Sequence, residues 1–112
     1  MEVLSTLVNK DGVDAFAGMS LTRGSAVLDF GSFPGSNEAS VTVTGQAGIL
    51  STHIPHAEIQ ALATSDHTTN DHAYAALFIQ LICGVPTDAT GFTIFARSLE
   101  KMQGTYNIQW NY

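Results

Sequence analysis

Residues 105–112, with the sequence TYNIQWNY, alternate polar and apolar side chains without a break. Side chains of a β-strand point to opposite faces with a period of two. The stretch therefore predicts a half-buried strand whose aromatic face turns to the core, while Thr105 lies on the opposite, solvated face. The residues expected to point inward are Tyr106, Ile108, Trp110 and Tyr112. This strand places the chain in the all-β class.

Other stretches upstream fit the same alternating template. They are residues 25–30, 39–44, 57–61 and 92–96. The sequence FPGSN at residues 33–37 is a strong turn signal, because proline presets φ and glycine accepts a positive φ. Short strands divided by such turns predict an antiparallel β-sandwich or barrel. The first expectation is a jelly-roll-like β-sandwich with about six to eight strands.

Three stretches between these strands are less regular. Residues 74–83 are apolar on both faces and predict a central strand covered on two sides, although their length also allows a helix to start near residues 73–76. Residues 64–72 have no apolar period and predict a loop. Residues 99–103 predict a polar connection that leads into the final strand.

The length of 112 residues is that of a single domain. We expect an N-terminal arm or edge strand at residues 1–24 and a β-sandwich domain at residues 25–112. The apolar side chains of the arm are Val3, Leu4, Leu7 and Val8. They predict an interface with a second copy of the chain. A closed cyclic assembly hides such edges, and a trimer is favoured.

The chain is poor in charge. Charged residues make up 12% of it, and the net charge is −6 with four basic residues. Nucleic acid and anionic membranes attract clustered Lys and Arg, so neither is an expected partner. Residues 1–8 lack the features of a signal peptide, and no run reaches the roughly 20 apolar residues of a membrane helix. So few charges are typical of a surface that neighbouring proteins cover in part.

Two Asp-His pairs lie close together in the sequence DHTTNDH at residues 66–72. The candidate metal ligands are Asp66, His67, Asp71 and His72, with His53 and His56 upstream. Carboxylate and imidazole are standard ligands of zinc and related ions. The structural alternative is a turn in which Asp and Thr side chains bond the backbone. This stretch is also the expected recognition loop if the chain has one.

No further residue pattern indicates catalysis. Cys83 is the only cysteine and lies in an apolar run, which predicts a small buried hydrophobe rather than a nucleophile. The aromatic residues expected in the core by their period are Tyr74, Phe78, Phe92, Phe95, Tyr106, Trp110 and Tyr112. Trp110 and Tyr112 have a second interpretation, as a sugar-stacking platform. Nucleophile elbows and nucleotide-binding loops are missing, so we expect no enzymatic activity and no cofactor.

The sequence LDFGSFPGSNEASV at residues 28–41 resembles small β-rich structural proteins encoded among the virion genes of tailed bacteriophages. The two Asp-His pairs, the block GFTIFA at residues 91–96 and the ending at 104–110 share that resemblance. It implies a non-enzymatic virion component, assembled in the host cytoplasm and bound to other virion proteins. A tail appendage or fibre-type module is the first expectation. A capsid decoration (cement) protein is the alternative, and a carbohydrate-binding module ranks third.

Overall fold

The computed structural model describes residues 22–112. Nearly all of the expected arm at residues 1–24, with its interface residues Val3, Leu4, Leu7 and Val8, lies outside this part. The described residues form six strands and one short helix. In chain order they are β1 (Arg23–Asp29), β2 (Ser36–Val43), β3 (His56–Ile59), α2 (Thr69–Ala75), β4 (Ile79–Cys83), β5 (Phe92–Met102) and β6 (Thr105–Asn111).

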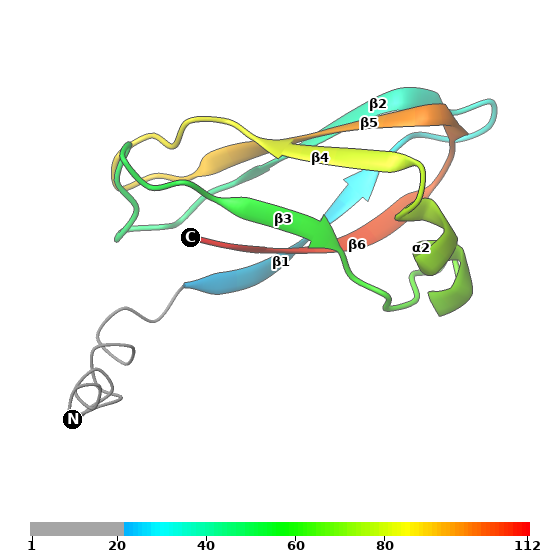
Figure 1. Cartoon of the computed structure of the whole chain (residues 1–112), viewed down its shortest axis with the longest axis horizontal. Helices are drawn as coiled ribbons and strands as arrows, with labels where there is room; N and C mark the ends of the chain where they lie inside the picture. The colour runs from blue at the N-terminus through cyan, green and yellow to red at the C-terminus, as the bar shows by residue number, and fades with distance from the viewer. Residues whose placement is uncertain (1–21) are drawn as a thin grey trace.

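The strands form two three-stranded antiparallel sheets, with the orders β1-β6-β3 and β2-β5-β4. The two sheets lie face to face, and α2 lies at one end of them (Figure 1). The predicted antiparallel β-sandwich is therefore confirmed. A jelly roll is not confirmed, because it has eight strands and residues 22–112 form six.

The connection between β5 and β6 runs from the centre of one sheet to the centre of the other. β5 extends to Met102, which pairs with Ser36 of β2, and β6 begins at Thr105. The polar connection predicted at residues 99–103 is therefore wrong for all but its last residue. Pairing with β2 keeps this polar segment in the sheet, because strand formation depends more on cross-strand contacts than on composition.

The apolar stretch at residues 74–83 is not a central strand. Its start belongs to α2 and its end to β4, which is an edge strand. Tyr74 and Ile82 are exposed. The sandwich has only two layers, so the outer face of β4 has no further layer to cover it. The helix that this stretch allowed does form, but it begins earlier, at Thr69.

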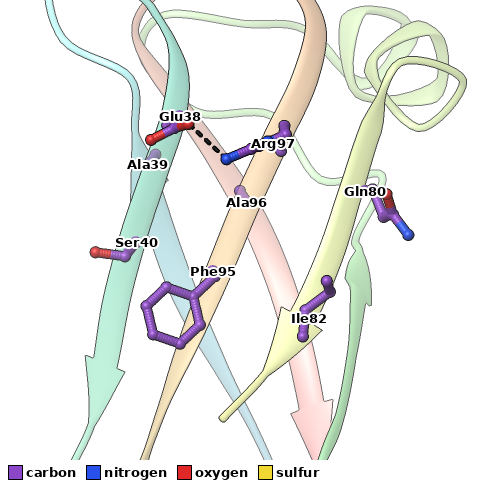
Figure 2. Close-up of a pocket in the computed structure, with 8 residues that line it drawn as sticks. All are labelled: Glu38, Ala39, Ser40, Gln80, Ile82, Phe95, Ala96 and Arg97. Carbon is purple, nitrogen blue, oxygen red and sulfur yellow. Dashed lines mark hydrogen bonds and ion pairs between the residues drawn. The ribbon is translucent and has the colours of Figure 1, made fainter.

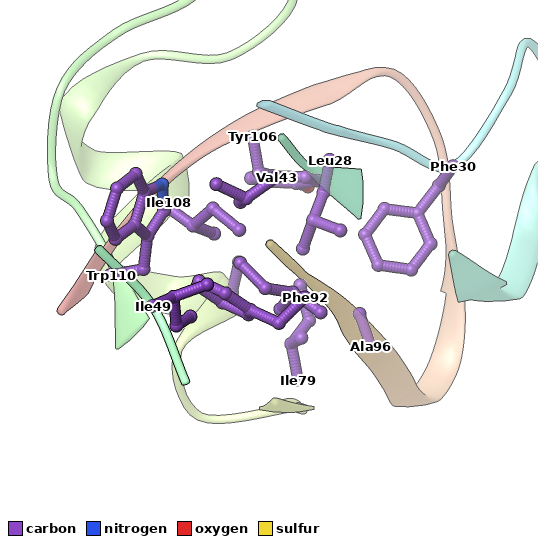
Figure 3. Close-up of a cluster of buried hydrophobic side chains, with 12 residues drawn as sticks. Leu28, Phe30, Val43, Ile49, Ile79, Phe92, Ala96, Tyr106, Ile108 and Trp110 are labelled. Carbon is purple, nitrogen blue, oxygen red and sulfur yellow. The ribbon is translucent and has the colours of Figure 1, made fainter. Parts of the chain in front are cut away.

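The core lies between the sheets and includes the inward side chains of the final strand (Figure 3). Trp110 is 6% exposed, and its ring stacks on Tyr112 with 5.9 Å between centroids. Phe92 meets the indole edge to face at 5.6 Å. This burial confirms the core interpretation of Trp110 and contradicts the sugar-stacking one. No helix within residues 22–112 is long and apolar enough to cross a membrane.

The polar face of β6 is covered over half its length, contrary to the expectation for Thr105. The Thr105 hydroxyl donates to Asp66 Oδ2 at 2.7 Å. Asn107 Nδ2 donates to the carbonyl oxygen of Leu62 at 2.7 Å. The segment that precedes α2 therefore packs on the outer side of this strand and covers Thr105 and Asn107. Gln109, further along the same face, is exposed.

We expect Trp110→Ala to lower the free energy of unfolding by about 3–5 kcal/mol, the range for large aromatic truncations in cores. The matched control is Gln109→Ala on the exposed side of the same strand, which should change stability by about 0.5 kcal/mol or less. Urea unfolding followed by far-UV circular dichroism measures both. Equal losses for the two variants would contradict a core position for the indole.

Candidate functional site

Residues 66–72, which hold four of the predicted metal ligands, lie at the end of the sandwich where the β5–β6 turn meets α2 (Figure 1). Asp66 Oδ2 accepts hydrogen bonds from the backbone N–H of Thr105 at 2.9 Å and from its hydroxyl at 2.7 Å. His67 Nε2 lies 2.6 Å from the Gln103 carbonyl oxygen. A carbonyl oxygen only accepts, so this nitrogen carries a proton. Both side chains thus hold the loop to the turn.

A capping box orders the second Asp-His pair. The Thr68 hydroxyl accepts from the Asp71 N–H, and the Asp71 carboxylate accepts from the Thr68 N–H, both at 3.1 Å. This reciprocal arrangement satisfies the free donors at a helix start. The predicted loop at residues 64–72 is therefore correct only as far as Thr68, because the capping box starts a helix there.

His72 is fully buried, and both of its ring nitrogens are used. Nδ1 donates to the Thr68 carbonyl oxygen at 2.8 Å, and Nε2 accepts from the backbone N–H of Asn107 at 3.0 Å. One donor and one acceptor fix the tautomer with the proton on Nδ1. His72 therefore joins the first turn of α2 to β6.

Two aromatic contacts complete this cluster. The His67 ring stacks on Tyr106 with 4.1 Å between centroids and 14° between planes. Tyr106 also meets His72 edge to face at 5.2 Å. Burial, together with the negative charge of Asp71, raises the pKa of Tyr106, so its phenol remains protonated. The cluster is a packed support for the β5–β6 turn.

Hydrogen bonds shift both carboxyl groups of the cluster. The Thr105 hydroxyl and then its N–H lower the pKa of Asp66 below the ordinary value of 3.8. The Thr68 N–H lowers the pKa of Asp71 in the same way. Donors favour the ionised form of a carboxyl group because they bond its negative charge.

The structure does not bring the predicted ligands together as a metal centre. Among residues 22–112, no group of three or more His, Cys, Asp or Glu side chains could hold an ion. His53 Nδ1 accepts from the Leu50 N–H at 2.8 Å. His56 pairs with Asn111, at the opposite end of β6 from Thr105. The upstream histidines therefore belong to another part of the fold.

Cys83 is half-buried against the core, as the sequence predicted for a small hydrophobe. Burial raises the pKa of its thiol. A raised pKa lowers the thiolate fraction, and the thiolate is the nucleophile. The environment of Cys83 therefore does not support covalent chemistry.

The sequence analysis missed a second surface, the outer face of the β2-β5-β4 sheet. Phe95 is 51% exposed there, and Ile82, its cross-strand neighbour, is 59% exposed. A shallow depression of about 610 Å³ runs over this face (Figure 2). Its lining residues are Glu38, Ala39, Ser40, Gln80, Ile82, Phe95, Ala96 and Arg97. The expected core position of Phe95 is therefore wrong. Its neighbours Ile94 and Ala96 point into the core, and successive side chains of a strand alternate, so Phe95 points outward.

A single ion pair crosses this outer face. Arg97 Nη2 lies 2.7 Å from Glu38 Oε2, and the two side chains are 75% and 65% exposed (Figure 2). Exposed pairs of this kind contribute about 1 kcal/mol or less to stability. Both charges are therefore available to a binding partner.

The cluster at the α2 end and the outer face of the β2-β5-β4 sheet differ in whether their side chains already have partners within the fold. At the α2 end the side chains bond the fold itself, whereas Phe95 and Ile82 on the outer sheet face have apolar area left in solvent. No family model, no curated protein and no solved structure matches this chain. The described part of the protein is thus defined as a small β-sandwich with one exposed apolar sheet face.

We expect Asp66→Asn to reduce the loss of stability in acid. The lowered pKa of Asp66 means that its stabilisation is present above pH 3.8 and is lost as the pH falls through the lower folded-state pKa. Urea unfolding between about pH 2 and pH 6 measures this dependence. Glu100→Gln, which removes one exposed carboxylate of β5, is the matched control. A pH dependence of Asp66→Asn equal to that of the wild type would contradict the role of the Thr105 bonds.

We expect His72→Phe to lower the free energy of unfolding by about 1–3 kcal/mol, the cost of one buried group left unpaired. The substitution leaves the Asn107 N–H without its partner, whereas the Thr68 carbonyl still accepts from the backbone N–H of residue 72. His56→Phe, at an exposed position of β3, is the control and should change stability by about 0.5 kcal/mol or less. An unchanged stability of His72→Phe would contradict the structural role of the His72 ring nitrogens.

Proposed function

We propose that the protein is a non-enzymatic structural component of a bacteriophage particle, a tail appendage or fibre-type module. One observation carries the proposal: the outer face of the β2-β5-β4 sheet exposes Phe95, Ile82 and Leu99. Exposed apolar residues that cluster on a sheet face mark a contact with another protein. The resemblance of residues 28–41 to virion proteins supports a contact that is made within a phage particle.

The scarcity of charge supports the same proposal. With charged residues at 12% of the chain, apolar and main-chain contacts dominate any interface that the protein forms. The proposed partners are other virion proteins and further copies of the chain, in the virion. The trimer expected from Val3, Leu4, Leu7 and Val8 stays a prediction, because these residues lie outside the described part.

The alternative function is that of a capsid decoration protein, which needs the same kind of binding face. Location in the particle separates the two. Antibody labelling of intact particles should place the protein on the tail, and labelling confined to capsid lattice points would overturn the tail assignment in favour of the decoration protein. A carbohydrate-binding module ranks lower, because Trp110 is buried in the core and offers no stacking platform.

We expect Phe95→Ser to lower the amount of the protein in purified particles at least about tenfold, the effect of losing one central apolar contact. Ile54→Ser is the matched control, since Ile54 is also exposed but lies outside this sheet. Quantitative immunoblotting of particles assembled with each variant measures incorporation. Incorporation of Phe95→Ser at the wild-type level would contradict the proposed role of this face. Turnover of a glycan or ester substrate by the purified protein would contradict the non-enzymatic assignment.

A further inference from the structure

The outer face of the β2-β5-β4 sheet carries two facing columns of residues, one on β2 and one on β5. The pairs that face each other across β2 and β5 are Glu38 with Arg97, Ser40 with Phe95, and Thr42 with Thr93. The first pair sets an acid against a base, and the second sets a small side chain against a large one. The third pair has two hydroxyls 3.1 Å apart. Every residue of one column is thus complementary to the residue beside it.

This complementarity has a consequence for packing between two copies of the sheet. A two-fold axis that runs parallel to the strands, between β2 and β5, lays each β5 residue over the β2 residue that it faces in its own sheet. Arg97 then lies over Glu38 of the partner subunit, and Phe95 lies over Ser40 of the partner subunit. Each contact forms twice, as in any isologous interface.

Other axes parallel to the strands do not give this match. An axis along β5 lays Arg97 over the partner's Arg97, which sets like charges together. An axis between β5 and β4 lays Arg97 over the partner's Gln80, because Gln80 is its neighbour on that side. Only the axis between β2 and β5 pairs the opposite charges.

We infer that a second copy of the chain docks on the outer face of the β2-β5-β4 sheet, about a two-fold axis between β2 and β5. The inference rests on the proposed function and names the partner of its binding face. Sheets stack about 10 Å apart and about 30° from parallel, which keeps the residues nearest the axis in contact. These are the Glu38–Arg97 and Ser40–Phe95 pairs. Leu99 lies further along β5, and Ile82 lies on β4, one strand further from the axis.

The depression on this face suits such a contact. It is open to solvent, has a volume of about 610 Å³ and includes Ser40, Ala39 and Phe95 in its lining, which leaves room for an aromatic ring of the partner (Figure 2). Phe95 and Ile82 would lose their exposed area to the partner's sheet, which stabilises association through the hydrophobic effect. The ion pair can exchange partners without losing its bonds, because each charge meets its opposite again across the interface.

A two-fold contact of this kind is compatible with a trimer built by the N-terminal arm. Dihedral symmetry combines two-fold and three-fold axes, so the two contacts together give six copies. The inference therefore requires an even number of chains in the assembly, and loss of the sheet contact halves that number.

Charge reversal on the full-length chain tests the inference. Arg97→Glu and Glu38→Arg each place like charges together twice in the interface. We expect each single variant to raise the dissociation constant at least about tenfold and the double variant to recover the wild-type value within about threefold. Sedimentation equilibrium over a concentration series measures the association. The melting temperature of each variant checks that the fold is intact, since an exposed pair contributes little to stability.

Two further variants separate the possible axes and surfaces. Gln80→Glu should leave the dissociation constant unchanged, whereas tighter association would overturn the axis in favour of one between β5 and β4. Ser40→Trp should block association by filling the space for the partner's Phe95, while Ile54→Ser should not.

Three results would overturn the inference: a chain that stays monomeric at high concentration, an odd-numbered assembly that none of the outer-face variants changes, or a double variant that does not recover. A monomeric chain that still enters particles would overturn the two-fold contact alone and leave the proposed function standing. Loss of incorporation by Ser40→Trp and Arg97→Glu together with loss of association would support both.

Discussion

Both sheets depend on one turn, in which Gln103 and Gly104 carry the chain from the centre of one sheet to the centre of the other. Gly104 has a φ of 78°, and a Cβ atom there would lie 2.8 Å from the Cβ of Asp66. Its N–H and carbonyl bond the backbone of Gly31 and Phe30 at 2.8 and 3.0 Å. The β1–β2 and β5–β6 connections, which both cross between the sheets, are therefore bonded to each other, and the loop before α2 closes over them.

The Asp-His stretch was the expected recognition loop, but its side chains stabilise the fold. The exposed apolar side chains lie instead on the outer face of the β2-β5-β4 sheet. The polar side chains of the Asp-His stretch bond backbone groups of the turn and of β6. His67 bonds the Gln103 carbonyl oxygen, and Asp66 and His72 accept from N–H groups of β6. The apolar residues of β4 and β5 are not all needed in the core, because a two-layer sandwich of short strands has only one interior. Phe95 and Ile82 lie on the other side, where a different molecule can meet them.

Local alternation was sufficient to predict β6, the strand class and the burial of Ile108 and Trp110, because a period of two is a property of the strand itself. Alternation did not predict features that depend on contacts with a segment distant in the sequence. β5 continues to Met102, which pairs with Ser36 of β2, and the coverage of Thr105 depends on a loop about 40 residues earlier in the chain. The helix α2 had a local signal in Thr68 and Asp71, the capping box, but its residues matched a polar loop equally well. The bonds of His72 reach Asn107, 35 residues away, and have no trace in the local pattern.

The position of the single tryptophan has a spectroscopic consequence. Trp110 lies between the sheets on β6, next to Gly24, whereas Phe95 lies on the far side of the opposite sheet. The indole emission therefore reports whether the sandwich is closed and is shielded from events on the outer face of the other sheet. Fluorescence from the unlabelled protein can follow folding while mass-based methods follow assembly, so the two equilibria can be measured in one sample without an added dye.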